Sequence, residues 1–330
     1  MPVRMVEALR AGVVESSHYG NAVVVDGDGR IICSEGDPER ISFFRSTSKP
    51  LQAIYFIESG IAEKFNLDLK EIAVITSSHT GEKEHINTLK SILKKIGEDE
   101  TVLKCGVHDP ISKEACNEIT LSGSKVSILH NNCSGKHLGF IATAKAKGYP
   151  IKDYYKSEHN VQVEAEKIIL EFGDIRQDDF KRGFDGCGVP VIAAPLKNLA
   201  KAYANLCNDD FKEGKYKKSQ SYLISAMSMY PEMVGGKGRV DTEIMKHFGS
   251  RIIGKIGDEA IFCAGIIGKA MGIAIKIEDG NMRALGPALM NLLLKLNIID
   301  ADETKDMMPI FKPVLTNHKG EIIGELRSVF

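Results

Sequence analysis

Strand signals at both ends of the chain, around a helical middle, constrain the fold more than any other feature. Six terminal segments are rich in β-branched or alternating apolar residues, as is typical of strands: Val13–Glu15, Ala22–Val25, Arg30–Cys33, Gly272–Ile277, Met282–Leu285 and Glu321–Val329. The turns Asp26-Gly27-Asp28-Gly29 and Glu278-Asp279-Gly280-Asn281 separate neighbouring segments and predict hairpins.

The middle of the chain has helical spacing of its apolar residues. This pattern predicts five helices, at Leu51–Ser59, Glu84–Ile96, Leu138–Lys147, Gln162–Phe172 and Pro195–Leu206. Two short apolar runs, Ile72–Ile75 and Lys125–Leu129, are predicted to be buried strands. We therefore expect one α+β domain over residues 1–330, with an antiparallel sheet built from strands at both termini and flanked by helices.

Composition excludes several classes of partner. The 330 residues carry 43 basic and 44 acidic side chains, a formal net charge of -1 that attracts neither nucleic acid nor an anionic membrane surface. We find no run of about 18 apolar residues, so no membrane span is predicted. Seven cysteines, an odd number, are interpreted as reduced thiols, which predicts a cytoplasmic location.

The stretch RSTSKPLQAIYF, from Arg45, places Ser46 and Lys49 three residues apart at a helix entrance. A serine hydroxyl becomes a nucleophile when a base accepts its proton, and a neutral lysine is such a base. Since Pro50 disfavours α geometry at Lys49, we expect the helix to begin at Thr47 or later, with Ser46 accessible just outside it. The alternative is that Ser46 or a neighbouring hydroxyl only caps the helix.

Two other stretches add hydroxyl and amine groups. Ser78 lies in VITSSHTGEKEH, between a predicted strand and a helix, where it is interpreted as a second hydroxyl that relays a proton or orients the amine. The alternative is that the stretch only starts the helix, through Thr80 with Glu82–Glu84 behind it. Lys255 lies between Gly254 and Gly257. It is either a surface turn residue or an inward cation near Lys49, in which case each amine would lower the pKa of the other.

Cysteines in two further stretches suggest a metal site or a thiol nucleophile. LHNNCSGKHLGF contains Cys133, Lys136 and His137, and GFDGCGVPV contains Asp185 and Cys187. Two thiolates and a nitrogen ligand are sufficient for zinc, although buried reduced cysteines are also common. A third hypothesis makes Cys133 a nucleophile with His137 as its base.

Taken together, the stretches resemble a known family. Seven blocks occur in the order found in the asparaginase II family, the rhizobial-type L-asparaginases: VVESSHYGNAVVVDGDGRI, RSTSKPLQA, SSHTGEKEH, LHNNCSGKHLG, FDGCGVPVIAAPL, PEMVGGKGRVDT and GKIGDEAIFCAG. The resemblance implies a fold similar to serine β-lactamases and glutaminases, hydrolysis of L-asparagine to L-aspartate and ammonia, and a homodimer.

The resemblance also implies roles for individual residues. Ser46 matches the nucleophile with Lys49 as its partner, and Ser78 with Lys255 matches a second Ser–Lys pair. The zinc ligands of the family match three positions: Cys133, Lys136 and Cys187. The substrate-contacting carboxylate matches Asp185, and Arg45 and His137 should lie close to it.

Three questions remain open at this point. No residue distinguishes asparagine from glutamine by rule, so a glutaminase or other small-amide hydrolase is an alternative. The thiol mechanism through Cys133 is a second alternative, and a non-enzymatic zinc or amino-acid binding protein is a third.

Overall fold

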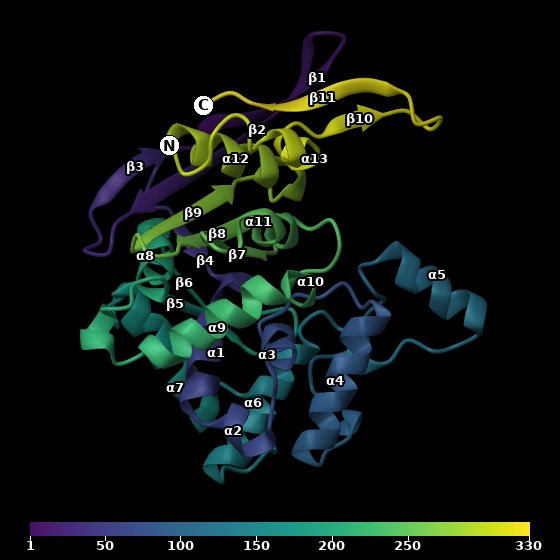
Figure 1. Cartoon of the computed structure of the whole chain (residues 1–330), viewed down its shortest axis with the longest axis vertical. Helices are drawn as coiled ribbons and strands as arrows, with labels where there is room; N and C mark the ends of the chain where they lie inside the picture. The colour runs from purple at the N-terminus through teal and green to yellow at the C-terminus, as the bar shows by residue number, and fades with distance from the viewer.

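The strands at the two ends of the chain form one large antiparallel sheet, above a mostly helical region (Figure 1). The computed structural model describes residues 1–330. The main strand order is β10 (Val314–Thr316), β11 (Ile322–Ser328), β1 (Val3–Arg10), β2 (Val13–Val25), β9 (Met271–Ile277), β8 (Ile261–Ile266) and β7 (Ile252–Gly257), with β3 (Ile31–Glu35) also paired to β2. The expected α+β class, with a sheet made from both termini, is confirmed.

A second, smaller sheet lies beside the helical region. Its antiparallel order is β4 (Ile41–Phe43), β6 (Pro190–Pro195) and β5 (Lys181–Phe184).

Thirteen α-helices complete the fold: α1 (Lys49–Glu58), α2 (Ile61–Phe65), α3 (Leu69–Ile75), α4 (Lys83–Ile96), α5 (Lys113–Ser122), α6 (Ser134–Lys147), α7 (Asn160–Gly173), α8 (Leu196–Leu206), α9 (Lys217–Met229), α10 (Pro231–Val234), α11 (Val240–Phe248), α12 (Leu285–Lys295) and α13 (Met308–Phe311). Six short 3₁₀ helices join them: η1 (Arg45–Ser48), η2 (Glu100–Val102), η3 (Ile128–His130), η4 (Phe211–Gly214), η5 (Met282–Ala284) and η6 (Lys305–Met307). None of the helices has the length and apolar content needed to cross a bilayer.

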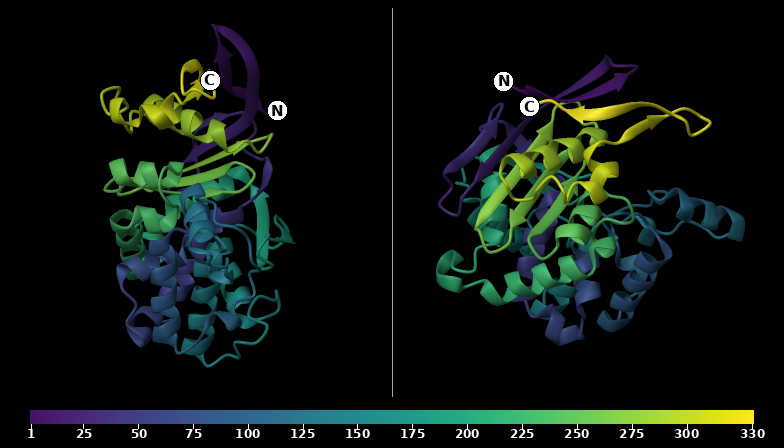
Figure 2. Two further views of the ribbon diagram at one scale, coloured as in Figure 1. Left: turned by 90° about the vertical axis from the view of Figure 1, so that its right-hand side faces the viewer. Right: turned by 45° about the horizontal axis from the view of Figure 1, so that its top comes forward.

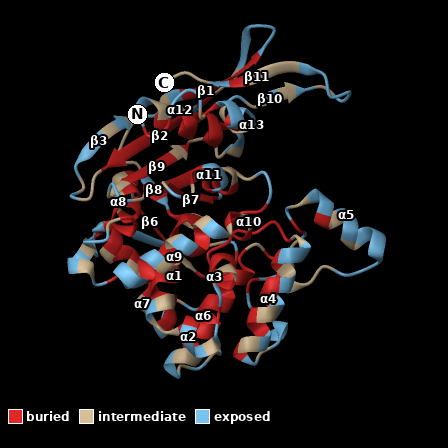
Figure 3. Ribbon diagram, in the orientation of Figure 1, coloured by how far each residue is buried: buried red, intermediate tan, exposed pale blue.

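The large sheet is buried on both faces at β7 and β8, where every residue is buried (Figure 3). Side chains alternate along a strand, so Val23 and Val25 of β2 enter one hydrophobic core while Ala22 and Val24 enter another. The first core joins the sheet to α1, α3, α6, α7, α8 and α9. The second joins its other face to α12 and part of α11, which gives the layered arrangement of Figure 2.

The predicted strand at Ile72–Ile75 is wrong: these residues end helix α3. A short apolar run has no decisive period of its own, so its ends determine its structure. Here Asp68 accepts a hydrogen bond from the backbone of Glu71, and the Glu71 side chain accepts one from the backbone of Asp68. This reciprocal capping box favours a helix start immediately before the run.

Two other predicted strands are also wrong. Lys125–Leu129 is a loop that ends in η3, where the Ser127 hydroxyl accepts a hydrogen bond from the backbone of Leu129. Met282–Leu285 forms η5 and the start of α12, and Asn281 caps η5 through the backbone of Arg283. In both cases a polar side chain satisfies backbone groups that a strand would have left to a neighbouring strand.

Helix α1 is held in the first core by aromatic packing, which gives a stability prediction. Phe56 is 1% exposed, and its ring meets that of Phe140 edge to face at 4.9 Å between centroids. We expect Phe56→Ala to lower the free energy of unfolding by about 3–5 kcal/mol, since it leaves a cavity in this core. Leu121→Ala, at a position 89% exposed, should change it by less than about 0.5 kcal/mol in the same denaturant titration.

Candidate active site

Ser46 lies in η1, directly before α1. The residue before it, Arg45, has a φ of 49°, a left-handed conformation that is uncommon for a residue with a side chain. Lys49 adopts α geometry despite the proline that follows, and its backbone N–H donates to the carbonyl of Ser46. A 3₁₀ turn superimposes positions i and i+3, so Ser46 and Lys49 share one face of this helical entrance.

Ser46 is buried, contrary to the accessible position expected from the sequence. It is 3% exposed because the end of strand β7 packs over η1. The approach is so close that a Cβ atom on Gly257 would lie 3.1 Å from the Cβ of Arg45. Beside Ser46, the Arg45 side chain is 22% exposed and its ion-pair partner Asp258 is 53% exposed.

Lys49 is 1% exposed and its amine joins three segments of the chain. Its Nζ donates to the carbonyl of Ser77 at 2.5 Å, to Ser78 Oγ at 2.9 Å and toward Cys133 Sγ at 3.2 Å. It makes no hydrogen bond to Ser46. Lys49 therefore pairs directly with the second serine of the expected site, while it shares a helical face with the first.

Ser78 is positioned by the segment between α10 and α11. Its backbone N–H donates to the carbonyl of Val234 at 2.9 Å. Val234 is followed in the chain by two closely packed glycines. A Cβ atom on Gly235 would lie 2.6 Å from Asp241 Oδ1, and one on Gly236 would lie 2.1 Å from Thr80 Oγ1. These glycines let the Ser78 loop and the start of α11 approach each other.

Lys255 lies inside β7, not in a surface turn. It points to the same side of the sheet as Ile253, toward the core that contains α1. Its Nζ donates to Asp241 Oδ2 at 2.8 Å and to the carbonyl of Ile256 at 3.1 Å, and it has no hydrogen bond to Ser78. Burial, with the cations of Lys49 and Arg239, lowers the pKa of Lys255 to about 8 against the opposing effect of Asp241.

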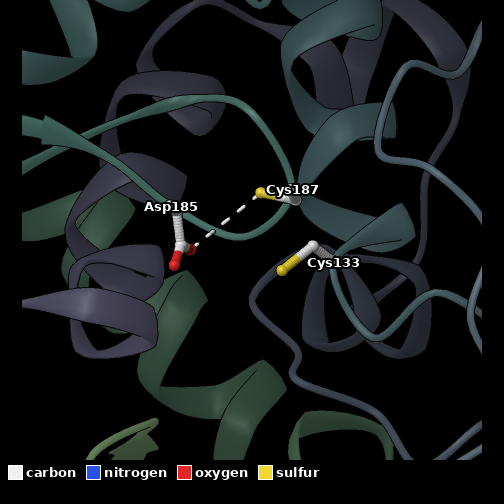
Figure 4. A group of neighbouring side chains, drawn as sticks. All are labelled: Cys133, Asp185 and Cys187. Atoms are coloured by element: carbon white, nitrogen blue, oxygen red, sulfur yellow. Dashed lines mark hydrogen bonds between the residues drawn. The ribbon is translucent and has the colours of Figure 1, made fainter.

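A second group of polar side chains lies where α6 begins and where β5 turns into β6. Cys133 precedes α6, while Asp185 and Cys187 belong to the β5–β6 turn, which Gly188 closes with a φ of 84°. The ligand atoms of these three residues lie within 4.8 Å of one another (Figure 4). Lys136 Nζ is 3.0 Å from Cys187 Sγ and 3.5 Å from Asp185 Oδ2.

Charge in this second group is balanced internally. A hydrogen bond from Cys133, together with the Lys136 ammonium, lowers the pKa of Cys187 to about 5 despite burial. Burial opposes the ionised form of Asp185, but Lys136, Lys49 and Arg45 together hold its pKa below the ordinary value. Burial likewise opposes the charge on Lys136, and the anions around it outweigh that effect and raise its pKa. The group thus contains a thiolate and a carboxylate around one ammonium.

Arg45 is paired with Asp185, and His137 makes no hydrogen bond to that carboxylate. Arg45 Nε donates to Asp185 Oδ1 at 2.9 Å, and its Nη2 donates to Asp258 Oδ2 at 3.2 Å. The one side-chain hydrogen bond of His137 joins its Nδ1 to the Tyr154 hydroxyl at 2.6 Å, and its Nε2 is buried without a partner. Burial and the Lys136 cation lower the pKa of His137 to about 3, so the ring is neutral.

A sequence model of L-asparaginase II matches residues 6–328. The chain belongs to the L-asparaginase II family. Its members are amidohydrolases, and the match covers every residue of the two groups described above. Among curated proteins, none matches the chain significantly.

Solved structures with similarity to this L-asparaginase II family chain have low sequence identity. The octameric penicillin-binding protein homologue from Pyrococcus abyssi is 13% identical, covers 88% of this chain and 76% of its own, and has a TM-score of 0.47. A class C β-lactamase mutant is 14% identical, with coverage of 82% and 92% and a TM-score of 0.41. Mglu in its native form is 11% identical, with a TM-score of 0.39; the match covers 85% of this chain, which spans 64% of Mglu.

The zinc ligands implied by the family resemblance form a suitable donor set in this chain. Two thiol sulfurs and one amine converge at the start of α6 and the β5–β6 turn, and sulfur with nitrogen is the donor combination that zinc prefers. Asp185 adds a carboxylate oxygen to the same space. In this structure the positive charge of the Lys136 ammonium balances the negative charges of Cys187 and Asp185. A bound metal ion would supply that positive charge instead, once the Lys136 amine had lost its proton.

The proposed thiol dyad is not formed. The His137 ring makes no hydrogen bond to the Cys133 thiol; only the backbone N–H of His137 donates to the Cys133 carbonyl, at 3.1 Å. The hydrogen bond with Cys187, with burial, raises the pKa of Cys133, so this sulfur is a thiol. Lys49 and Asn131 contact Cys133 instead, through its sulfur and its backbone N–H respectively.

Two carboxylates of the site were not among the predicted residues. Asp258 is an ion-pair partner of Arg45, and Asp241 is the partner of Lys255. The only sequence signal for Asp241 is its place in PEMVGGKGRVDT, three residues after the last of three glycines. Such a signal shows that a carboxylate starts a helix but not which cation it meets.

The close packing at Gly236 leads to a prediction for this family member. Gly236 has a φ of 109°, and a Cβ there would collide with Thr80, two residues from Ser78. We expect Gly236→Ala to destabilise the protein by at least about 2 kcal/mol, because backbone strain and overpacking add together. The measurement is the midpoint of thermal unfolding.

Gly238→Ala provides the matched control for that measurement. Its φ is also positive, at 75°, but nothing lies within 4 Å of the added Cβ. Equal destabilisation by the two variants would contradict the close approach of the two loops.

Proposed function

We propose that the protein is an L-asparaginase, which hydrolyses the side-chain amide of L-asparagine to L-aspartate and ammonia with Ser46 as nucleophile. The observation that carries the proposal is the position of Lys49. This buried amine shares a helical face with Ser46, is hydrogen-bonded to Ser78 Oγ, and has no carboxylate partner. The other two lysines of the site each contact a carboxylate, so Lys49 suits the role of proton acceptor best.

In the first half of the proposed reaction the ester bond to the enzyme forms. Neutral Lys49 accepts the proton of Ser46 as its oxygen attacks the amide carbon of the substrate. Backbone N–H groups at the helical entrance stabilise the negative charge on the carbonyl oxygen. Ser78 orients the Lys49 amine through their hydrogen bond, and the departing nitrogen takes its proton from a separate acid.

In the second half, water attacks the acyl carbon and Ser46 recovers its proton. The proton returns from Lys49, which restores the starting state of the pair. The free acid then ionises to aspartate. Lys255, on strand β7, is the candidate for the acid of the first half, and it recovers its proton from the attacking water.

Substrate recognition is proposed to involve the Arg45–Asp185 side of the site, where Asp258, the other ion-pair partner of Arg45, is 53% exposed. Asp185 is the candidate partner for the α-amino group, because its carboxylate is ionised and is held by Arg45. Arg45 is the candidate for the α-carboxylate. The unpartnered Nε2 of His137 would take part only through direct contact with the substrate or the metal.

We further propose that Cys133, Lys136 and Cys187 hold a zinc ion. When bound, zinc would supply a positive charge beside the substrate pocket. The proposed reaction uses Ser46 and Lys49 for proton transfer, so it needs no metal-activated water. The homodimer implied by the family resemblance also remains a prediction.

The serine assignment can be tested by substitution. We expect Ser46→Ala to lower kcat for asparagine hydrolysis at least about 10⁴-fold, since a nucleophile acts as a unit with its base. Ammonia release measures the rate, and intact mass after reaction with a slow amide analogue measures the acyl adduct. Peptide mapping should place the adduct on Ser46.

Ser48→Ala is the matched control, because Ser48 lies in the same motif but donates to the carbonyl of Arg45. It should retain activity within about tenfold. Full acylation in Ser46→Ala, with loss of acylation in Cys133→Ala, would replace this mechanism with the thiol alternative. Equal rates with glutamine and asparagine would widen the substrate.

The metal proposal predicts a pH dependence of zinc affinity. Binding requires deprotonation of thiol and amine ligands, so affinity should fall as pH falls. Metal content by mass spectrometry should be close to one zinc per chain for the wild type and strongly reduced in Cys187→Ser. Cys33→Ser, on strand β3, should keep the wild-type content. Unchanged zinc content in Cys187→Ser would place the metal elsewhere.

A further inference from the structure

Asp241 forms an ion pair with Lys255 that is sealed from solvent. Both side chains are 0% exposed, and Asp241 Oδ2 lies 2.8 Å from Lys255 Nζ. The same oxygen accepts the backbone N–H of Ile256 at 3.1 Å, and Oδ1 accepts that of Thr242 at 3.1 Å. Because β7 is the edge strand, Asp241 satisfies a backbone donor that has no further strand to pair with.

Three hydrogen bonds fix the Asp241 carboxylate, so it cannot follow a moving lysine. Its ionised form is stabilised by Lys255 and Arg239 against the cost of burial, and its pKa is below the ordinary value. A fixed, charged carboxylate orients the Lys255 amine and favours its protonated form.

The groups around Lys255 come from every element packed on β7. The charged or titratable neighbours are Asp241 and Arg239 at the start of α11, Lys49 at the start of α1, Arg45 of η1, and Cys263, the cross-strand partner on β8. Helix α9 also packs on β7, but its Lys217 and Lys218 pair with Asp209 and Glu63. Asp241 is therefore the only anion that contacts the Lys255 amine.

We propose that Asp241 is a positioning residue that holds Lys255 as an ammonium ion, and that Lys255 thereby acts as the acid that protonates the departing nitrogen. The inference rests on the proposed hydrolysis and assigns one proton transfer within it. Asp241 does not touch the substrate and acts only through Lys255. The lowered pKa of about 8 for Lys255 fits an acid that gives up its proton readily near neutral pH.

The proton balance of the two half-reactions closes. In acylation, the bond from Ser46 Oγ to the amide carbon forms, Lys49 takes the serine proton, the carbon–nitrogen bond breaks, and Lys255 gives the nitrogen the proton with which it leaves as ammonia. In deacylation, water attacks the acyl carbon and gives a proton to the neutral Lys255. The bond to Ser46 breaks, and Lys49 returns its proton to that oxygen.

The test compares two leaving groups in Asp241→Asn. Amide nitrogen needs a proton to leave, whereas 4-nitrophenolate leaves without one. We expect the acylation rate for asparagine to fall about 10²–10⁴-fold, and the rate of the initial 4-nitrophenolate burst from the 4-nitrophenyl β-ester of aspartate, which reports acylation alone, to change less than about tenfold. The alkaline limb of the asparagine profile should also move to lower pH by about one unit or more, since loss of the carboxylate lowers the pKa of Lys255.

Glu71→Gln is the matched control for a buried carboxylate. Glu71 lies on helix α3, is 3% exposed, and forms an ion pair with Lys95 of helix α4. This variant should lose stability but keep the wild-type ratio of amide to ester rates and the wild-type pH profile. A purely structural role for Asp241 predicts the same behaviour for both variants, and that result would overturn the inference.

A second variant keeps the test decisive if Asp241→Asn does not fold. Asp241→Asn combined with Lys255→Met removes both charges, so no unpaired ion is left in the core. The folded double variant should show the same selective loss of amide hydrolysis, and a wild-type amide-to-ester ratio would overturn the inference. If the wild type releases no ammonia from asparagine or glutamine, the proposed function itself fails and the inference fails with it.

Discussion

The buried amine of Lys49 is the interaction on which the arrangement of the site depends. An amine that is 1% exposed needs hydrogen-bond partners inside the protein, and Lys49 has them on the Ser77–Ser78 loop and at the start of α6. These segments are far apart in sequence. The amine therefore sets the distance between the helical entrance that carries Ser46 and the loop that carries the second serine.

The three buried lysines of the site differ in what balances their charge. Lys136 lies against the Cys187 thiolate and Asp185, and Lys255 lies against Asp241. Lys49 contacts only a carbonyl oxygen, a hydroxyl and the Cys133 thiol. In the proposed mechanism Lys136 stays a cation, Lys255 is held by Asp241 as the acid, and Lys49, which has no anion beside it, is the base.

Sequence predicted the sheet and most helices because their signals are local. The strand at Glu321–Val329 and the helices around Leu51–Ser59 and Glu84–Ile96 have a clear period, and the structure has each within a few residues. Ile72–Ile75 was predicted wrongly because four apolar residues fit both a strand and a helix, and the capping residues Asp68 and Glu71 decide between them.

The partners of the lysines could not be predicted in the same way. A lysine side chain reaches far enough to meet any of several neighbours, so spacing does not select one. The pairing of Lys255 with Asp241 follows from two tertiary facts, the position of β7 at the sheet edge and the packing of α11 against it. Motif blocks locate the chemical groups, and only the fold decides which of them share a proton.

The sheet edge explains why the second lysine comes from a strand and its carboxylate from a helix. An edge strand exposes backbone donors that must be satisfied, and Asp241 accepts the one at Ile256 while it holds the amine at Lys255. A single carboxylate thus satisfies a backbone donor at the sheet edge and forms an ion pair with the lysine of the site. Because Asp241 Oδ2 makes both contacts, a shift of strand β7 at Ile256 would also alter the ion pair that favours the protonated form of Lys255.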